Sequence, residues 1–252
     1  MNPKITDWRN KRVWLLGASS GIGAALAQAL ARDGARLVLS GRDAGRLAGL
    51  GIEAALLQPC DATDVSSLVM AREAIRSVLG GIDVVIYLAG DYQPMHADHF
   101  DLAQAERLFG VNYLGAVRLT SILLPDFLMA GGGIAFVASV AGYRGLPKAM
   151  AYGPGKAALI SFAESLKFDL APKGIGVWVI NPGFVATRLT ARNDFKMPAL
   201  LSPGEAARAT LEGFSSGRFE IHYPKRFTWA MKLLSCLPYS WYFSLVRYAM
   251  GG

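Results

Sequence analysis

Short apolar stretches alternate with amphipathic stretches along the chain from Arg12 to Ile180. The apolar stretches have the length of strands, and one of them, IDVVIYLAG over 82–90, is almost continuous in β-rich apolar residues. Such a composition is typical of a strand buried on both faces of a sheet. The stretches between them carry apolar residues at helical spacing. This alternation predicts an α/β fold, a doubly wound parallel sheet with helices on both faces.

The expected elements can be assigned by residue range. We expect one domain over 1–252, because no linker or repeat divides the chain. Within it, residues 190–252 are expected to form a substrate lid and a largely helical C-terminal extension rich in aromatic and basic residues. Either Ser66 or Ser67 is expected to cap the second helix. Strands are expected over 12–17, 35–41, 54–61, 82–90, 133–139 and 175–183, and helices over 22–34, 67–80, 103–132 and 152–174.

The composition supports a large core, because 52% of the 252 residues are hydrophobic and 18% are charged. The cysteines, Cys60 and Cys236, are too few for a disulfide framework and indicate a reducing cytoplasm. No uninterrupted apolar run reaches the roughly 18 residues of a membrane-spanning helix. The net charge is +7, but the basic residues form no contiguous stripe, so we expect no nucleic-acid partner.

A glycine-rich turn, GASSGIG, follows the first expected strand and opens the first expected helix. Gly17, Gly21 and Gly23 would let the backbone approach a pyrophosphate, and the helix N-terminus would present free N–H groups to it. Ser19 and Ser20 can add hydroxyl donors. At the first strand-to-helix turn of a parallel sheet, this pattern indicates a Rossmann-type dinucleotide site.

The end of the second strand bears on the choice of cofactor. An enzyme that prefers NAD usually has an acidic residue there to bind the ribose 2′-hydroxyl, whereas this chain has Ser40, Gly41 and Arg42. The Arg42 guanidinium suits a 2′-phosphate, so NADP(H) is favoured over NAD(H). The alternative is that Arg42 is solvated and Asp43 binds the ribose.

Further candidates follow the later strands. Asp61 would accept a hydrogen bond from the adenine amino group, or alternatively Asp61 or Asp64 would cap a helix. Asn112 lies inside an apolar helical pattern, where a buried amide must find partners.

A tyrosine and a lysine share one helix face four residues apart, at Tyr152 and Lys156. Tyrosine titrates near 10, and a nearby ammonium group would lower its pKa toward neutrality. Ser139, at the end of the fifth strand, can donate to a substrate oxygen. After the last strand, Pro182 and Gly183 form a turn that would wall the nicotinamide ring, and Thr187 can hold its carboxamide.

These residues, in this order, resemble the short-chain dehydrogenase/reductase family. The resemblance is carried by GASSGIG, by AG at 89–90, by Asn112, Ser139, YGPGK and NPG, and covers about three quarters of the chain. It implies NAD(P)(H)-dependent exchange of a hydride with a carbonyl or secondary alcohol. It also implies a homodimer or homotetramer.

The resemblance further implies roles for single residues. Tyr152 would exchange the proton, and Lys156 would bind the nicotinamide ribose and lower the pKa of the tyrosine. Ser139 would hold the substrate oxygen, and Asn112 would organise a water-linked proton path. The cofactor-binding candidates are Gly17, Ser19, Ser20, Gly21, Ile22, Gly23, Arg42, Asp61, Ala89, Gly90, Tyr152, Lys156, Pro182, Gly183, Val185 and Thr187.

Several positions depart from the family pattern. The family commonly has threonine where Leu16 stands, and two asparagines where Tyr87 and Leu88 stand. Small residues usually fill the positions of Pro154 and Gly155. Proline is tolerated in the first turn of a helix, so the helix should begin close to Tyr152.

The C-terminal stretch 221–252 is rich in aromatic residues with interspersed cations, and Pro238 should divide it into two short helices. Three interpretations remain open: the stretch closes the substrate pocket and packs on the core, it forms a subunit interface, or residues 221–250 make peripheral contact with a membrane. The third would accompany a lipid-like or otherwise hydrophobic ketone.

The sequence thus favours an NADP(H)-dependent oxidoreductase that acts on a small-molecule carbonyl or alcohol. The alternative is a catalytically silent NADP(H)-binding sensor or scaffold. His96 and His99, in the loop after the fourth strand, are interpreted as solvated residues, and no metal site is expected.

Overall fold

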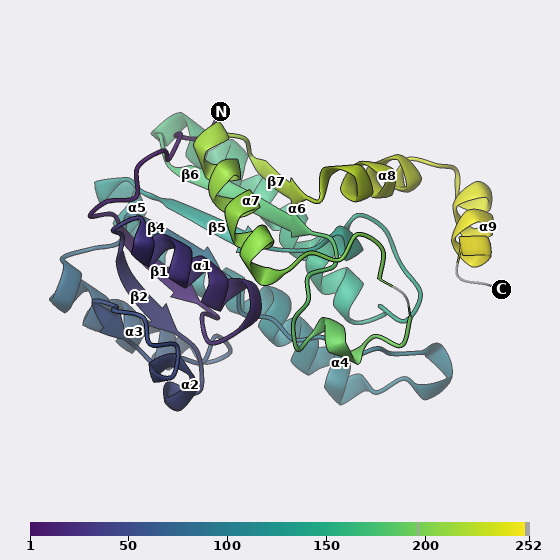
Figure 1. Ribbon diagram of the computed structural model, residues 1–252, viewed down its shortest axis with the longest axis horizontal. Helices are drawn as coiled ribbons and strands as arrows, with labels where there is room; N and C mark the ends of the chain where they lie inside the picture. Colours follow the sequence, from purple (N-terminus) through teal and green to yellow (C-terminus); the bar gives the residue numbers. More distant parts are fainter. Residues whose placement is uncertain (196, 250–252) are drawn as a thin grey trace.

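A seven-stranded sheet, parallel throughout, forms the centre of the computed structural model, which describes residues 1–195 and 197–249 (Figure 1). The strand order is β3-β2-β1-β4-β5-β6-β7, so the chain reverses direction across the sheet between β1 and β4. This is the doubly wound Rossmann-type arrangement that the sequence predicts. The strands are β1 (Arg12–Leu16), β2 (Arg36–Ser40), β3 (Leu56–Leu57), β4 (Val84–Tyr87), β5 (Gly133–Val137), β6 (Gly176–Pro182) and β7 (Glu220–Tyr223).

Helices cover both faces of the sheet, as expected for a single α/β domain. On one face, α1 packs on α7 over a core that includes Trp178 and Phe214. On the other face, α3, α5 and α6 cover a core that includes Tyr87 and Phe136. The helices are α1 (Gly21–Arg32), α2 (Ala44–Ala48), α3 (Val65–Leu79), α4 (Leu102–Phe109), α5 (Gly115–Ala130), α6 (Tyr152–Leu170), α7 (Pro203–Ser216), α8 (Lys225–Ser235) and α9 (Tyr239–Ala249).

Two local expectations about helices were wrong. The cap of α3 is Asp64 rather than Ser66 or Ser67, because its carboxylate accepts the Ser66 backbone N–H at 2.9 Å. The helix expected over 103–132 is also not uniform. A π-helical turn, η2 (Gly110–Leu114), joins α4 to α5.

The expectation of a largely helical extension over 190–252 is incomplete. β7 lies in this range and pairs in parallel with β6, and α7 packs against α1, so both belong to the central fold. Pro238 does separate two helices, α8 and α9, as predicted. Figure 1 shows these two helices extending from the body of the domain beyond β7.

The continuous helical stretch Leu102–Ala130 is long and apolar enough to cross a membrane by length and composition alone. A core helix passes the same test, and here Leu119, Leu123 and Phe127 are buried against the sheet. We therefore assign this stretch to the protein core.

Candidate active site

The glycine-rich turn lies at the carboxyl edge of the sheet, between the ends of β1 and β4. Gly17 has φ +105°, and a Cβ atom added there would lie 2.5 Å from the backbone nitrogen of Ala89. A Cβ on Gly23 would lie 2.3 Å from the Gly17 carbonyl oxygen. These contacts leave no room for side chains, so the turn brings bare backbone to the N-terminus of α1.

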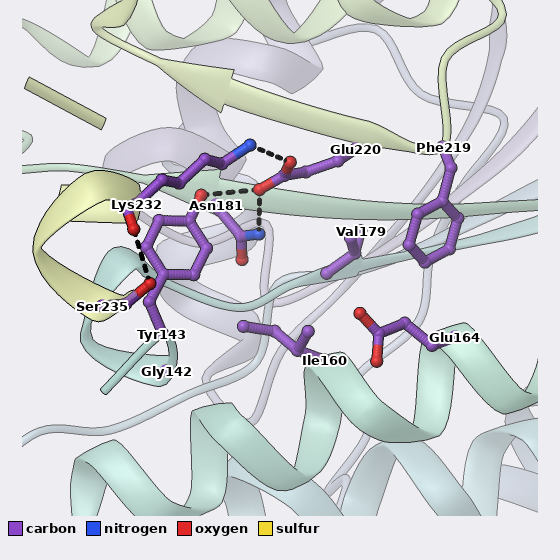
Figure 2. A pocket seen from close by; sticks show the side chains of 10 residues that line it. All are labelled: Gly142, Tyr143, Ile160, Glu164, Val179, Asn181, Phe219, Glu220, Lys232 and Ser235. Atoms are coloured by element: carbon purple, nitrogen blue, oxygen red, sulfur yellow. Dashed lines mark hydrogen bonds and ion pairs between the residues drawn. The ribbon is translucent and has the colours of Figure 1, made fainter. Parts of the chain in front are cut away.

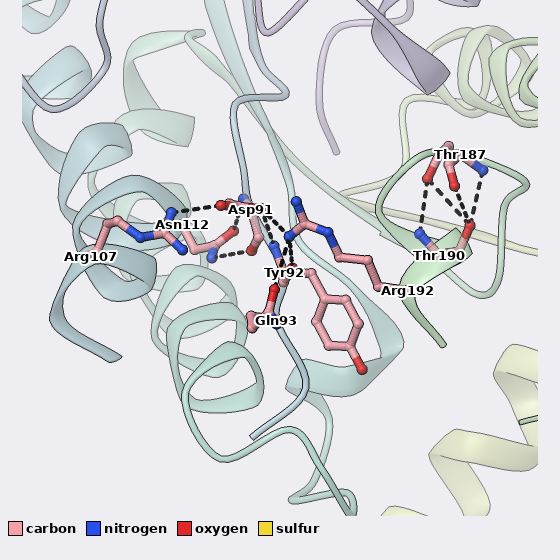
Figure 3. Close-up of polar contacts among 8 residues, drawn as sticks. All are labelled: Asp91, Tyr92, Gln93, Arg107, Asn112, Thr187, Thr190 and Arg192. Atoms are coloured by element: carbon pink, nitrogen blue, oxygen red, sulfur yellow. Dashed lines mark hydrogen bonds and ion pairs between the residues drawn. The ribbon is translucent and has the colours of Figure 1, made fainter. Parts of the chain in front are cut away.

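The segment after β6 reaches the same turn. A Cβ on Gly21 would lie 2.9 Å from Cγ2 of Thr187. The backbone N–H of Thr187 donates to Oγ1 of Thr190 at 2.9 Å (Figure 3). That hydroxyl donates to the Val185 carbonyl at 2.6 Å. Thr187 is therefore held beside the glycine turn, where the sequence predicts a cofactor contact.

Arg188 is a further residue at this turn that the sequence did not identify. Its guanidinium donates to Oγ of Ser20 at 3.0 Å, across 168 positions of the chain. A cation beside free helix N–H groups suits a phosphate. The only signal in the sequence was its position next to Thr187.

The end of β2 places Arg42 and Asp43 in different roles. Asp43 caps α2, because its carboxylate accepts the Arg46 backbone N–H at 3.0 Å. Arg42 is exposed, and its charge contributes to a lowered pKa of Asp61 at the end of β3. A Cβ on Gly41 would lie 3.5 Å from Oγ of Ser19. Arg42 thus stands beside the glycine turn with its side chain in solvent.

Asp61 is held in a local turn. Its carboxylate accepts both the backbone N–H and the hydroxyl of Thr63, each at 2.8 Å. Burial opposes ionisation, but these hydrogen bonds and Arg42 keep the pKa of Asp61 below its ordinary value. Asp64, the other residue considered as a cap, is the one that caps α3.

Asn112 occupies the π-helical turn and is fully buried. Its amide nitrogen donates to the Asp91 carbonyl at 2.8 Å, and its amide oxygen accepts the Asp91 backbone N–H at 3.3 Å (Figure 3). A Cβ on Gly90 would lie 2.9 Å from that oxygen and 3.5 Å from Nζ of Lys156. The structure therefore brings Asn112, Gly90 and Lys156 together at the end of β4.

Tyr152 and Lys156 lie in the first turns of α6, which begins at Tyr152 as predicted. The Lys156 ammonium group donates to the Val137 carbonyl at 2.8 Å and lies 5.6 Å from the centre of the Tyr152 ring. Ser139 follows β5, and its hydroxyl accepts the Ala141 backbone N–H at 3.1 Å.

The effect expected of Lys156 on the pKa of Tyr152 stays a prediction, because burial, Ser139 and Tyr92 are the influences on this pKa in the structure. Burial raises the pKa of Tyr152 to about 12, while a hydrogen bond with Ser139 acts in the opposite direction. Burial also lowers the pKa of Lys156 to about 7. Desolvation disfavours the charged form of each residue, so it opposes the ammonium–phenolate pair.

Gly155 faces the π-helical turn, against which α6 packs. A Cβ atom there would lie 3.4 Å from Cβ of Asn112 and 3.8 Å from Cδ2 of Phe109. These are ordinary contact distances, so alanine would fit and nothing in the structure explains glycine at this position.

Asp91 connects the site to the segment after β6, and the sequence did not identify it. Its carboxylate accepts from Arg107 at 2.6 Å and from Arg192 at 2.9 Å (Figure 3). Arg192 also donates to the Tyr92 carbonyl. The Tyr92 ring lies edge-on to that of Tyr152, with 5.1 Å between centres. Tyr92 thus forms a wall beside the candidate catalytic tyrosine.

The C-terminal helices pack next to these elements. Gly183, in the turn after Pro182, is so close to α8 that a Cβ there would lie 2.8 Å from Cδ1 of Phe227. Arg144 donates to main-chain carbonyls at the end of α8, among them that of Leu237 at 2.5 Å. Tyr242 of α9 is buried, and its hydroxyl donates to the Gly145 carbonyl at 2.5 Å. Packing on the core, one of the three interpretations of this stretch, therefore describes α8 and Tyr242.

A cavity of about 350 Å³ lies between α6, β6, β7 and α8. Glu220 is its polar centre and accepts from Tyr143 at 2.6 Å, from Asn181 at 2.8 Å and from Lys232 (Figure 2). The cavity is lined by Gly142, Tyr143, Ile160, Glu164, Val179, Asn181, Phe219, Glu220, Lys232 and Ser235. It contains none of the candidate catalytic residues.

Among residues 1–195 and 197–249, no group of three or more His, Cys, Asp or Glu side chains is placed to hold a metal ion. His99 is largely exposed, as expected for a solvated loop residue.

Comparison with known proteins identifies the family. The family model for short chain dehydrogenase matches residues 11–197. An uncharacterized oxidoreductase of Myxococcus xanthus is 33% identical over 232 residues, which cover 88% of this chain and 90% of the relative. The ketoacyl reductase HetN of Nostoc sp. is 30% identical over 231 residues, which cover 86% of this chain and 79% of the relative.

Solved structures agree with this assignment. The 3-ketoacyl-(acyl-carrier-protein) reductase of Brucella melitensis, complexed with NADH, has a TM-score of 0.79 and 26% identity, and the match covers 86% of this chain and 98% of that one. A short chain dehydrogenase of Burkholderia cenocepacia in complex with NADP has the same fold, with a TM-score of 0.83 at 23% identity and coverage of 98% and 100%. The cofactors of these two neighbours differ, NADH in the first and NADP in the second. This chain belongs to the short-chain dehydrogenase family, as an oxidoreductase that acts on CH–OH and C=O groups.

Proposed function

We propose that this protein reduces a carbonyl compound with NADPH, and that Tyr152 donates the proton. The observation that carries the proposal is the convergence of Tyr152, Lys156 and Asn112 on the edge of the sheet that holds the glycine turn. Ligands of doubly wound sheets bind at this edge, beside the point where the strand order reverses. A nicotinamide cofactor, when bound, supplies the hydride.

The residues at the edge fit such a cofactor. The contacts of Gly17 and Gly23 leave a bare cradle at the N-terminus of α1, which suits the pyrophosphate. Arg188 and Ser20 add donors beside it. Ala89 and Gly90 would present small residues to the cofactor, and Pro182, Gly183 and Thr187 would line the nicotinamide. Ile22 and Val185 would complete the lining.

Tyr152 is a phenol at neutral pH, because burial raises its pKa to about 12. A phenol can donate the proton that carbonyl reduction requires. Ser139 would donate to the carbonyl oxygen as negative charge develops on it. Lys156, anchored by the Val137 carbonyl, would reach the nicotinamide ribose.

The preference for NADPH rests on the end of β2. Asp43, the acid that would bind a ribose 2′-hydroxyl, is already engaged as the cap of α2. Arg42 is exposed beside the glycine turn, where a 2′-phosphate would lie. We expect NADPH to raise the melting temperature more than NADH, and Arg42→Ala to raise the KM for NADPH about tenfold, since one charged contact is worth roughly 1.5 kcal/mol. Equal stabilisation by NADPH and NADH would contradict the proposed preference for NADPH.

The proposed reaction is tested by NADPH consumption against a panel of carbonyl compounds. The panel should include hydrophobic ketones and 3-oxoacyl thioesters, because a relative and a structural neighbour are named as ketoacyl reductases. Tyr152→Phe removes only the hydroxyl and should lower kcat by a factor of about 10² to 10⁴, the usual contribution of a general acid. An unchanged rate in this variant would remove Tyr152 from the mechanism.

The same measurements separate turnover from the alternative of a silent sensor. A sensor would bind NADPH tightly and consume it with no member of the panel. The intact set of Ser139, Tyr152 and Lys156 favours the enzyme. We propose a homo-oligomer as its working form, for which light scattering of the purified protein is the direct test.

A further inference from the structure

Tyr87 stands where the family commonly has asparagine, and its side chain is fully buried. It is the last residue of β4, three positions before Gly90. Its hydroxyl donates to the Val111 carbonyl at 2.5 Å, across 24 positions of the chain. Burial raises the pKa of Tyr87 far above its ordinary value, so the hydroxyl keeps its proton and stays a donor.

The acceptor of this hydrogen bond belongs to the π-helical turn. Val111 directly precedes Asn112 in Gly110–Leu114. Insertion of a π-helical turn disturbs the regular i→i−4 bonding of an α-helix. A buried carbonyl needs a partner, and the Tyr87 hydroxyl gives Val111 one from outside the helix.

Gly115 leaves the space that the tyrosine needs. A Cβ atom added to Gly115 would lie only 2.2 Å from the Tyr87 hydroxyl oxygen and 2.9 Å from the Ala62 carbonyl oxygen. Alanine at this position would therefore collide with the hydroxyl. Tyr87 and Gly115 form a matched pair, in which one residue supplies the donor and the other leaves room for it.

The consequence reaches the active site through Asn112. The Asn112 amide makes two hydrogen bonds with the backbone of Asp91, and a Cβ on Gly90 would meet its oxygen at 2.9 Å. Gly90 and Asp91 lie in the segment that follows β4, and Tyr87 is the last residue of that strand. The tyrosine thus ties the π-helical turn to the strand whose end carries the partners of Asn112.

We infer that Tyr87 is a positioning residue. Its hydroxyl fixes the π-helical turn, so that the Asn112 amide keeps its hydrogen bonds with Asp91 and its place in the expected proton path beside Lys156. This inference rests on the proposed function for its kinetic consequence. The geometric part, the hold of Tyr87 on Asn112, does not depend on turnover.

Tyr87→Phe is the direct test, because it keeps the ring and removes only the donor. We expect kcat to fall about tenfold with the KM for NADPH unchanged, since small displacements of catalytic groups have effects of this order or larger. The pH profile of kcat should change as it does in Asn112→Ala. The double variant should be no slower than Asn112→Ala alone, because both changes act on one group.

Tyr113→Phe is the matched control. It removes a hydroxyl from the same π-helical turn, and in the part of the chain that the structure describes this hydroxyl makes no hydrogen bond. Its kcat should stay within twofold of the wild-type value. A Tyr87→Phe variant that loses stability but keeps the wild-type kcat and pH profile would overturn the inference and leave Tyr87 a structural residue.

A measurement without turnover separates this inference from the proposed function. The Asp91 backbone N–H donates to Asn112, so its hydrogen exchange reports on the position of that amide. Exchange at Asp91 should become at least tenfold faster in Tyr87→Phe and stay unchanged in Tyr113→Phe. If the wild type consumes no NADPH, but exchange at Asp91 is faster in Tyr87→Phe than in the wild type, the proposed function fails and the positioning role stands. Unchanged exchange at Asp91 would refute the positioning role.

Discussion

The carboxyl edge of the sheet and the C-terminal segment α8–α9 lie next to each other but are held in different ways. At the edge, contacts of the glycine turn leave no room for added atoms, as at Gly17. In α8–α9, a few long side chains reach the body of the domain, and Trp241, Phe243 and Tyr248 are exposed. Close approach of backbone segments fixes the edge, whereas contacts of side chains such as Arg144 hold α8–α9.

This difference indicates where substitution should be tolerated. A Cβ atom added 2.5 Å from a backbone nitrogen cannot be accommodated without moving a strand, so a single methyl group is costly there. A side chain that bonds carbonyl groups at a surface can be lost with a local effect. Substitutions at the edge should therefore weaken cofactor binding, and substitutions that free α8–α9 should make this segment more dynamic.

The largest effect is expected from Gly17→Ala. The substitution places a Cβ atom 2.5 Å from the Ala89 nitrogen at a φ of +105°, which L residues rarely adopt. We expect NADPH affinity to fall by a factor of about 100 or more and the free energy of unfolding to fall by about 3 kcal/mol. Calorimetric titration and denaturant unfolding measure the two effects.

Gly145→Ala is the control for this change, because a Cβ atom there meets no atom within 4 Å. Gly145 contacts α9 through its carbonyl, so the pair compares the two regions with the same substitution. Wild-type NADPH affinity in Gly17→Ala would contradict the role given to the backbone cradle.

A smaller effect is expected from Arg144→Ala. The guanidinium bonds the carbonyls of Ser235 at 2.9 Å and Leu237 at 2.5 Å, and it lies 4.5 Å from the Tyr239 ring centre and 4.1 Å from that of Tyr242. Its loss should lower the free energy of unfolding by about 2 kcal/mol. Hydrogen exchange should increase in α9 but not in α1.

The exposed Arg226 of α8 offers the control for this experiment, and Arg226→Ala should change neither quantity. If exchange in α1 rose together with exchange in α9, the two regions would unfold as one unit, and the comparison between them would fail.

The smallest effect is expected on the pH dependence of the free energy of unfolding, through the ionisation of Glu220. Burial opposes ionisation, but hydrogen bonds from Lys232, Tyr143 and Asn181 keep the pKa of Glu220 below its ordinary value of 4.5. A lowered folded-state pKa means that this stabilisation is present above the unfolded-state pKa and is lost as the pH falls through the folded-state value. The free energy of unfolding of the wild type should therefore decrease below about pH 4.5.

Glu220→Gln keeps the shape and removes this titration, so chemical unfolding at pH 3 and pH 7 isolates the contribution of Glu220. The difference in stability between variant and wild type should be larger at pH 7 than at pH 3. A difference that is the same at both pH values would show that the ion pair with Lys232 adds no stability.

Much of the fold was predictable because strand ends and helix starts carry local signals. The continuous apolar strands and the helix that begins at Tyr152 follow from composition and from the first-turn proline Pro154. The strand β7 was missed because it has only four residues, Glu220–Tyr223, and leads directly into the aromatic stretch that follows. Asp64 was one of several cap candidates in the sequence, and the choice against Ser66 or Ser67 was not predictable because nearby serines carry the same signal.

The π-helical turn at Asn112 had no local signature beyond an amide in an apolar helix. The hydrogen bonds of the Asn112 amide go to Asp91, 21 positions away, so only the folded chain could reveal them. The sequence showed that Tyr87 departs from the family pattern, but it did not show which residues Tyr87 contacts. These residues include Gly115 and Val111, which approach Tyr87 only in the folded chain.

The sequence by itself determined the parallel sheet, the glycine turn and the order in which Asn112, Ser139, Tyr152 and Lys156 follow their strands. It could do so because the carboxyl ends of parallel strands meet at one edge, whatever their separation in the chain. Only the tertiary structure decided what supports these residues: Arg188 at Ser20, Asp91 between two arginines, and Tyr87 at the π-helical turn. Such contacts join segments that are far apart in the chain, and no local pattern of residues encodes which segments meet in the fold.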